Sequence, residues 1–478
     1  MSTPSTLPAS VADGVKPRLG WTLALLALAQ LIYALDLNIV FVALPRIGAD
    51  LGFPGQTQQL VVSAYVVFAG GFLLFGGRAA DLLGRRRVFV LALALYALSS
   101  LAGGLATGPV VIIVARAVQG VGGALLLPST LALLNSLFAE GRQRNRALAV
   151  WGGAGASGLT IGALLGGVLT ENFGWPAVFF VNVPLAGLVA LAALAVVPRD
   201  PARRERRRFD MPGALTVTGG STLLVFALVE GPELGWSSPL VAGTFAVAAV
   251  LLVIFALVEA RSADPLMPFR LFRNRSLTVG MLVTFVYMAT FGVLPYFLTV
   301  LLQSVHGYSA LQSGLAFLVP SLAIAAGTQG GERLATRIGT RATLLIGFAV
   351  GVAGTAVLAL GFDADAGYGL LIPGLVVSGL GQGVVWTAMW IAAATGTPAH
   401  EQGVANGIAS TALNIGNAIG LAVFTVIADL GTAGRTGQAL RAATADGEFL
   451  VVLLTAAVMI AGLLVTLTLP RCTPDPTP

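Results

Sequence analysis

Apolar stretches recur along the whole chain, and they restrict its fold more than any other feature. A helix needs about 20 apolar residues to cross the hydrocarbon core of a bilayer, and these stretches are that long. Hydrophobic residues make up 56% of the chain and charged residues only 10%, whereas soluble domains carry roughly 25% charged residues. Unbroken runs indicate helices, since barrel strands would alternate in short segments. The sequence therefore predicts an all-α polytopic membrane protein.

Fourteen apolar segments can be delimited along the chain, and their even number predicts that both termini lie on one side of the membrane. The predicted spans are 21–44, 58–77, 88–106, 110–135, 148–170, 178–197, 212–230, 239–258, 277–302, 312–330, 342–361, 368–392, 404–428 and 448–469.

The positive charges are distributed very unevenly over the predicted loops. Of the 27 Lys and Arg residues, 23 lie in the tails and in the loops on the side of the termini. The opposite loops hold three, Arg46, Arg435 and Arg441, and Arg116 lies inside a span. Positive residues collect on the cytoplasmic side of membrane proteins, so both termini are predicted to be cytoplasmic. The isoelectric point near 10.0 then reflects topology, and nucleic-acid binding is not expected.

Two predicted cytoplasmic loops resemble each other and indicate an internal repeat. The loop "GGRAADLLGRRR" (76–87) follows the second span, and "GERLATRIGTR" (331–341) follows the tenth. Aligning Gly76 with Gly331 also aligns Gly84 with Gly339. A general preference of tight cytoplasmic loops for Gly and Arg is the alternative explanation. The repeat predicts two six-helix bundles with two additional central spans, divided as a tail 1–20, a bundle 21–197, a basic linker 198–211, the additional spans 212–258, a linker 259–276, a bundle 277–469 and a tail 470–478.

Five segments, in order, resemble motifs of the major facilitator superfamily, and in particular of its fourteen-helix drug:proton antiporter branch. They are "LDLNIVFVALP" (35–45), the Gly-x-x-x-Asp-x-x-Gly-Arg loop at 77–87, "RAVQGVGGA" (116–124), "GASGLTIGALLGG" (155–167) and "FFVNVP" (179–184). The resemblance covers residues 20–470. It implies the major facilitator fold and export of small molecules in exchange for protons. One departure is Ala163, which follows Gly162 where the family motif usually has proline.

The resemblance implies roles for two of these segments. The loop residues Gly77, Asp81, Gly84, Arg85 and Arg86 would form a gate that latches the two halves in the outward-facing state. A tight turn that follows the positive-inside rule is the alternative.

The fifth-span segment would be the antiporter motif that prevents proton leak, with Gly158, Gly162, Gly166 and Gly167 as its residues. Three of these glycines recur at every fourth position and form a smooth stripe, which close packing against another helix also explains.

The sequence does not support an energy source other than an ion gradient or the substrate itself. A phosphate-binding Walker loop requires Gly-Lys, and the single lysine, Lys16, lies in the N-terminal tail. No His-Glu-x-x-His pattern occurs. We therefore expect secondary transport driven by the proton gradient, with no ATP, metal or other cofactor, and no enzymatic activity.

Asp36 is a carboxylate inside an apolar run, where an acid costs roughly 2.5–3.5 kcal/mol on insertion scales. It lies eight residues from the outer end of the first span, and Arg116 lies seven residues into the fourth, which starts on the same side. At about 1.5 Å per residue both side chains lie roughly 10–12 Å deep, so they could pair. Intramembrane ionisable groups are usually functional, which favours Asp36 and Arg116 as the proton-coupling site. The alternative is an ion pair that only locks two helices together.

Six further polar or amphipathic residues inside spans are candidates for lining a substrate cavity: Asn38, Tyr65, Gln119, Trp386, Asn414 and Asn417. A cavity with few charges suits bulky amphipathic compounds. We expect a monomeric exporter of drugs, antibiotics or secondary metabolites in the cytoplasmic (inner) membrane, with lipid, protons and a small-molecule substrate as its partners. A proton-linked symporter or facilitator is one alternative, and a membrane sensor or scaffold that does not transport is another.

Overall fold

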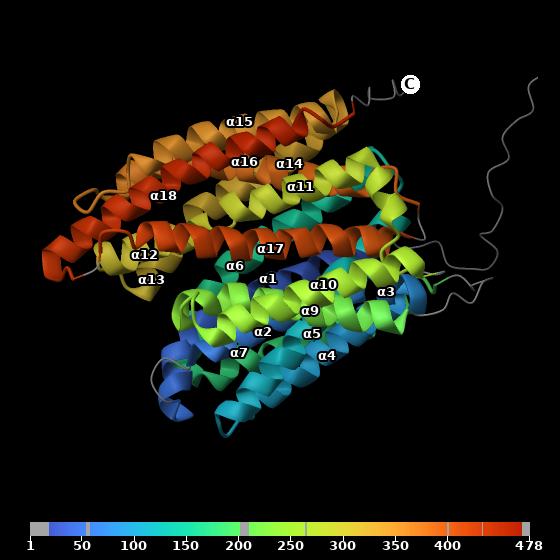
Figure 1. Cartoon of the computed structure of the whole chain (residues 1–478), viewed down its shortest axis with the longest axis horizontal. Helices are drawn as coiled ribbons and strands as arrows, with labels where there is room; N and C mark the ends of the chain where they lie inside the picture. Colours follow the sequence, from blue (N-terminus) through green and yellow to red (C-terminus); the bar gives the residue numbers. More distant parts are fainter. Residues whose placement is uncertain are drawn as a thin grey trace, which may run out of the picture.

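The computed structural model describes residues 19–53, 58–200, 210–262, 265–398, 401–432 and 434–470, and all regular elements in these ranges are helical. Most of the predicted tails 1–20 and 470–478 and of the linker 198–211 lies outside the described residues. The helices run roughly side by side and form two bundles (Figure 1).

The N-terminal bundle contains α1 to α8. Helix α1 packs along α6, and α4 packs against both α5 and α8. Helices α2 and α3 form one bent segment with an angle of 51° between its parts. The elements are α1 (Leu19–Asp50), α2 (Leu60–Gly71), α3 (Leu73–Leu83), α4 (Arg85–Gly104), α5 (Pro109–Leu137), α6 (Arg142–Phe173), α7 (Pro176–Phe180) and α8 (Asn182–Val196).

The C-terminal bundle repeats this arrangement. Helix α15 packs against α16 and α18, and α11 packs along α17. The elements are η2 (Phe269–Arg273), α11 (Arg275–Thr290), α12 (Leu294–Val300), η3 (Leu301–Val305), α13 (Ala310–Ala316), α14 (Leu318–Ile338), α15 (Thr340–Ala359), α16 (Tyr368–Ala394), α17 (Gln402–Ala428) and α18 (Gly437–Thr466).

The two loops that resemble each other in sequence also have the same backbone conformation. Gly84 separates α3 from α4 with φ of 103°, and Gly339 separates α14 from α15 with φ of 83°. Positive φ is readily adopted by glycine and disfavoured for residues with a Cβ. The repeated glycines therefore mark the same tight helix–helix turn in each bundle.

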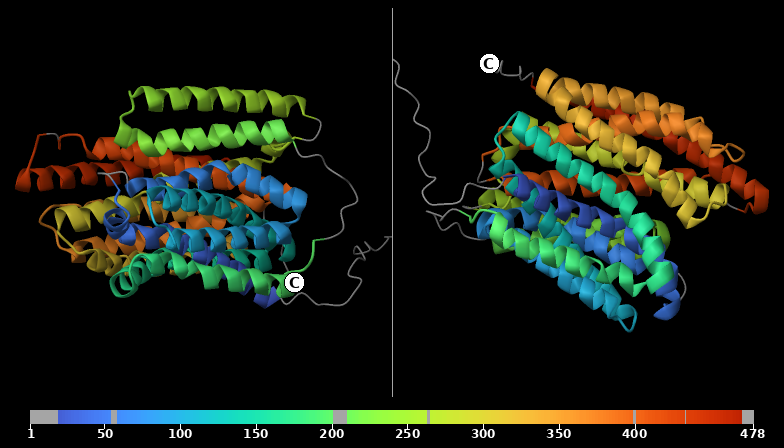
Figure 2. Two further views of the ribbon diagram at one scale, coloured as in Figure 1. Left: turned by 90° about the horizontal axis from the view of Figure 1, so that it is seen from below. Right: turned by 180° about the vertical axis from the view of Figure 1, so that it is seen from behind.

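Two additional helices, α9 (Met211–Leu234) and α10 (Pro239–Arg261), lie along one side of the molecule (Figure 2, left). Each begins with a side-chain cap. The Asp210 side chain accepts a hydrogen bond from the Gly213 N–H, and the Ser238 side chain accepts one from the Val241 N–H. Helix α9 packs against α2 of the N-terminal bundle and α17 of the C-terminal bundle. The pair therefore covers a boundary between the two bundles.

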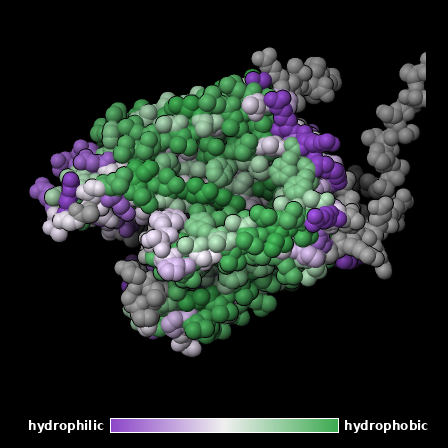
Figure 3. All heavy atoms as spheres, in the orientation of Figure 1, coloured by the Kyte–Doolittle hydropathy of each residue, from purple (hydrophilic) through white to green (hydrophobic). Residues whose placement is uncertain are grey.

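The surface has an apolar belt between two hydrophilic ends (Figure 3). Among the described residues, twelve helices are long and apolar enough to cross a membrane, and the bent pair α2–α3 would make thirteen. Helix α6, which contains the predicted span 148–170, is not among them. The all-helical membrane fold is thus confirmed, whereas the count of fourteen spans and the cytoplasmic termini stay predictions.

Candidate functional site

Asp36 and Arg116 form an ion pair inside the N-terminal bundle. Arg116 Nη1 on α5 lies 2.6 Å from Asp36 Oδ2 on α1. The two side chains are 1% and 0% exposed, respectively. The equal depth predicted from the helical rise therefore corresponds to direct contact in the structure.

Neutral amides complete the surroundings of the carboxylate. Gln119 Nε2 and Asn182 Nδ2 each donate to Asp36 Oδ1 over 2.9 Å. Gln119 Nε2 also lies 2.9 Å from Ser100 Oγ, and all three polar residues are buried. These residues come from α4, α5 and α8, so four helices meet at Asp36. We call Asp36, Arg116, Gln119, Asn182 and Ser100 the Asp36 network.

Arg116 has partners other than the carboxylate. Its Nη1 donates to Gln119 Oε1 over 2.9 Å, and its Nε donates to the Val61 carbonyl over 3.1 Å. The guanidinium carbon lies 4.3 Å from the centroid of the Tyr65 ring, a distance at which a cation–π interaction is favourable. The Tyr65 hydroxyl in turn lies 3.3 Å from that of Tyr96. The guanidinium is therefore held from several sides.

The glycine stripe of α6 fixes the position of the helix that carries Asp36. A Cβ on Gly158 would lie 2.6 Å from the Leu31 carbonyl oxygen, and one on Gly166 would lie 2.7 Å from that of Ile39. A Cβ on Gly162 would collide with the Leu35 backbone in the same way. The three glycines thus permit close contact of α6 with α1 over two turns. Gly167 lies off this stripe and faces open space.

Asp81 joins the two bundles. Its carboxylate accepts hydrogen bonds from the backbone N–H groups of Gly403 (3.1 Å) and Val404 (2.8 Å), at the N-terminus of α17. A carboxylate is favourable there because a helix N-terminus has unpaired N–H groups and a partial positive charge. Gly77 allows this approach, since a Cβ on it would meet the Gly403 backbone.

The remaining residues of the predicted gating loop act within the N-terminal bundle. Arg85 Nη2 lies 3.9 Å from Asp81 Oδ1. Gly84 adjoins Asp200, whose Oδ1 accepts from the N–H groups of Arg85 (2.9 Å) and Arg86 (3.4 Å) at the start of α4. Arg86 also donates to the Leu194 carbonyl. These contacts hold the loop against the end of α8.

Further hydrogen bonds link the bundles at the same end of the molecule. Asn135 Nδ2 at the end of α5 donates to Gln402 Oε1 over 3.2 Å. Asn145 Nδ2 near the start of α6 donates to Thr336 Oγ1 on α14 over 3.3 Å. The bundles are therefore in contact at the end that the charge distribution assigns to the cytoplasm.

The six residues predicted to line a substrate cavity lie in different surroundings, and their role stays a prediction. Tyr65 and Gln119 belong with the Asp36 network, and Trp386 packs against Trp151 and Trp390. Asn414 Nδ2 donates to the Ser410 carbonyl over 3.0 Å. Asn38 and Asn417 are partly buried.

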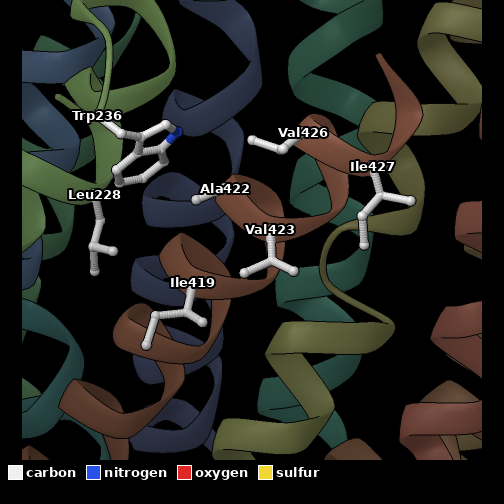
Figure 4. A pocket seen from close by; sticks show the side chains of 7 residues that line it. All are labelled: Leu228, Trp236, Ile419, Ala422, Val423, Val426 and Ile427. Atoms are coloured by element: carbon white, nitrogen blue, oxygen red, sulfur yellow. The ribbon is translucent and has the colours of Figure 1, made fainter. Parts of the chain in front are cut away.

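Two apolar cavities lie along α17. One, of about 390 Å³, lies between α17 and the additional helices and is bounded by Leu228 and Trp236 (Figure 4). The other, of about 270 Å³, lies nearer the N-terminal end of α17, between Leu74, Ile408 and Phe285. Neither contains a predicted cavity residue.

Glu448 is a second acid deep within a helix. The predicted last span begins at Glu448, whereas α18 begins at Gly437, eleven residues earlier. Glu448 is 1% exposed, and its Oε2 has no hydrogen-bond partner. Hydropathy does not predict the first turns of α18 as part of the helix, because their residues are polar.

Among the described residues, no group of three or more His, Cys, Asp or Glu side chains could hold a metal ion. The paired helical bundles and the apolar belt define a multi-pass membrane protein. The chain belongs to the Major Facilitator Superfamily, whose family model matches residues 26–421, and it is therefore a membrane transporter rather than an enzyme.

Similar sequences include resistance and export proteins of Streptomyces and Amycolatopsis species. The chain is 37% identical over 445 residues to the puromycin resistance protein pur8 of Streptomyces alboniger, covering 92% of this chain and 88% of that protein. It is 38% identical over 428 residues to the cephamycin export protein CmcT of Amycolatopsis lactamdurans, covering 87% and 86%. It is 33% identical over 426 residues to the tetracenomycin C resistance and export protein of Streptomyces glaucescens, covering 89% and 78%.

Solved structures with a similar fold are more distant in sequence. The human organic anion transporter MFSD10 has a TM-score of 0.68 at 19% identity, covering 94% of this chain and all of that chain. The proton:xylose symporter XylE has a TM-score of 0.66 at 14% identity, covering 93% and 94%. At these identities the likeness concerns the fold alone.

Proposed function

We propose that this protein is a proton-coupled exporter of amphipathic antibiotics, drugs or secondary metabolites in the cytoplasmic membrane. It works as a monomer by alternating access, and the proton gradient replaces ATP and any bound cofactor. The observation that carries the proposal is the Asp36 network, whose buried carboxylate has partners suited to both of its protonation states.

The charged state is supported by Arg116 and two amide donors. When a proton binds Asp36, the ion pair is lost, but the guanidinium keeps Gln119 Oε1, the Val61 carbonyl and the Tyr65 ring. Losing one partner of a buried pair is strongly destabilising when the other charge is left uncompensated. These other partners reduce that penalty for Arg116. An ion pair that only holds two helices together would not need them, because it would stay charged.

Asn182 can adapt to the neutral state. Its Nδ2 donates to Asp36, whereas its Oδ1 is buried without a hydrogen-bond partner. Rotation of the amide by half a turn would present this oxygen to the O–H of a protonated Asp36. The O–H of Asp36 would then donate to Asn182 Oδ1, and release of the proton would restore the present arrangement.

The contact of Asp81 with α17 supports alternating access. It ties the bundles together at the predicted cytoplasmic end, and it must break before substrate can enter from that side. While the bundles are closed at the predicted cytoplasmic end, Asp36 would bind a proton from the opposite side of the membrane. After the bundles open at that end, Asp36 would release the proton to the cytoplasm. This exchange would couple the proton gradient to export.

The substrate class follows from the family relatives and from the composition of the protein. Relatives of this chain carry the names of puromycin, cephamycin and tetracenomycin C exporters or resistance proteins. Few charges lie within the predicted apolar spans, which suits amphipathic compounds better than strongly charged ones.

Drug susceptibility and proton release test the proposal together. A pump-deficient host that expresses the protein should show raised resistance to some members of a chemically broad panel. Purified protein in detergent should release protons when such a compound is added. Asp36→Asn should abolish both effects while still inserting, because removal of a buried charge lowers the insertion cost.

The exposed loop variant Asp365→Asn is the matched control and should behave as the unaltered protein. Proton release or a maintained gradient in Asp36→Asn would show that Asp36 is not the coupling site. Proton-driven uptake would indicate a symporter, and no movement of any compound would indicate a sensor or scaffold.

A further inference from the structure

Glu448 on α18 is a buried acid without the donors that such groups normally have. Its side chain is 1% exposed, and its Oε2 has no hydrogen-bond partner. Among the described residues, no base forms an ion pair with it. Other buried acids show the usual situation, because Glu401 pairs with Arg270 and Glu259 accepts from two backbone N–H groups. Buried polar groups are normally satisfied, so the carboxyl of Glu448 calls for an explanation.

The surroundings of Glu448 disfavour a negative charge. Helix α18 closely approaches the C-terminal end of α17 at this point, because a Cβ on Gly447 would collide with the Ala428 carbonyl oxygen. A helix C-terminus has unpaired carbonyl groups and a partial negative charge. The exposed carboxylate of Asp429, which ends α17, repels a second negative charge on Glu448. A proton on Glu448 removes both the repulsion and the cost of burying a charge.

Basic groups near this part of α18 are directed elsewhere. Arg441 precedes Glu448 by seven residues, on the same face of α18 and roughly 10 Å away along the axis. Its Nη2 lies 3.7 Å from the position that a Cβ on Gly307 would take, just beyond η3. His306 Nε2 lies 2.9 Å from a backbone carbonyl oxygen of the loop after α15. Helices α11 and α15, which also pack against α18, carry charged residues only at their predicted cytoplasmic ends: Arg275 and Arg341.

We infer that Glu448 is a proton-binding site at the end of α17 opposite its contact with Asp81. A proton needs one oxygen atom, whereas a metal cation such as Ca²⁺ needs about six to eight oxygen ligands. No group of three or more acids, His or Cys in the described part of the chain offers such a set. Helix α18 packs against α11, α15, α17 and η3, all of the C-terminal bundle. The site is therefore separate from the Asp36 network, and the inference does not rest on the proposed export.

The proton holds a segment that reaches the other bundle. The face of α18 that carries Arg441 and Glu448 borders η3, a π-helical turn, and such turns are frequent at functional sites. The next helix, α13, touches the N-terminal bundle, where a Cβ on Gly314 would lie 3.6 Å from Leu164 Cδ2 of α6. Loss of the proton leaves an uncompensated charge beside α17 and η3. Deprotonation of Glu448 therefore loosens the segment α12–η3–α13.

Infrared difference spectroscopy detects this proton directly. The full-length protein is measured in lipid nanodiscs in neutral buffer, and the spectrum of Glu448→Gln is subtracted from that of the unaltered protein. We expect the carbonyl stretch of a protonated carboxyl in the difference, and we expect its loss as the buffer is made alkaline. Asp446→Asn, which alters an exposed acid two residues away, is the matched control and should keep the band.

The position of η3 is measured in the same nanodiscs by pulsed electron paramagnetic resonance. With Cys472 replaced by serine, nitroxide labels are placed at Gln303 on η3 and Gln438 on α18, which are both exposed. In the otherwise unaltered protein, the distance distribution should widen over the pH range in which the infrared band is lost. In Glu448→Gln, which cannot ionise, the distribution should stay narrow throughout.

Three results would overturn the inference. Absence of the band, or a band that persists in alkaline buffer until the protein unfolds, would leave Glu448 a structural residue. A band that weakens when sodium replaces choline at constant pH would indicate a metal-cation site. The same widening in both proteins would show that Glu448 does not hold η3.

Two further variants keep the test independent of other assumptions. If Glu448→Gln does not fold, Glu448→Met provides the same subtraction. Asp36→Asn should keep the band of Glu448, because the two acids lie in different bundles. Failure of the proposed coupling mechanism would therefore leave the proton site of Glu448 untouched.

Discussion

The contact between Asp81 and α17 allows a quantitative prediction about how firmly the two bundles are closed at the predicted cytoplasmic end. Asp81→Asn replaces a carboxylate that accepts two backbone N–H groups by an amide that can accept with only one atom. A hydrogen bond to a charged group contributes about 1.5–3 kcal/mol, and a charge at a helix N-terminus adds about 0.3–1 kcal/mol. We expect a loss of about 2–4 kcal/mol from the closed state, which shifts the ratio of closed to open molecules roughly 30- to 1,000-fold.

The distance between the predicted cytoplasmic ends of the two bundles reports this shift. Arg142 at the start of α6 and Arg337 near the end of α14 are exposed and lie on different bundles. With Cys472 replaced by serine, cysteines at these two positions carry nitroxide labels for pulsed electron paramagnetic resonance. The distance distribution should be short in the unaltered protein and mostly long in Asp81→Asn. Turnover should fall while substrate binding is largely retained.

Asp200→Asn is the matched control for this measurement. Asp200 also accepts two backbone N–H groups at a helix N-terminus, but both belong to α4 of the same bundle. Its replacement should leave the distance distribution unchanged. If Asp81→Asn is folded and also shows no shift, Asp81 does not latch the bundles, and the contact is only a helix cap.

Other consequences of the structure can be measured separately. Arg116→Ala should reduce the amount of folded protein in the membrane, because it leaves the Asp36 carboxylate without its ion-pair partner at a cost of about 3–5 kcal/mol. Thermal stability in detergent measures this effect. A variant as stable as the unaltered protein would contradict the prediction. Gly162→Leu should separate α6 from α1 and lower both thermal stability and export. Gly167→Leu should be tolerated, because the new side chain would enter open space. Equal effects of the two substitutions on stability and export would refute the role of the glycine stripe. A reporter enzyme fused after Arg275 should be found in the cytoplasm, and a signal from the opposite side would refute the assignment of the two additional spans.

The sequence was sufficient to predict the helical fold and the Asp36–Arg116 pair. Both predictions rest on how few charges the apolar segments contain. Asp36 and Arg116 are conspicuous in such segments, and the constant rise of a helix gives their depths. The shared geometry of the two glycine turns could also be predicted, because a positive φ restricts the choice of residue.

Other parts of the site could not be predicted, for identifiable physical reasons. Asn182 and Ser100 are neutral residues of ordinary kinds, and only the three-dimensional packing of α4 and α8 brings them to Asp36. The partners of Asp81 are backbone N–H groups more than 320 residues away, which leave no mark in the sequence. Glu448 was placed at a helix end because hydropathy alone does not reveal how far α18 extends.

The position of α9 has a consequence for how lipid meets the moving protein. Towards α2 it is held by a hydrogen bond from Ser221 Oγ to the Gly71 carbonyl (3.3 Å) and by packing of Val225 on Gly70. Towards α17 it faces the apolar cavity bounded by Leu228 and Trp236. Apolar contacts have no preferred direction, so α17 can slide past this surface without breaking hydrogen bonds. Helices α9 and α10 should therefore move with the N-terminal bundle. They would exclude lipid acyl chains from the boundary between α2 and α17 while the two bundles move relative to each other.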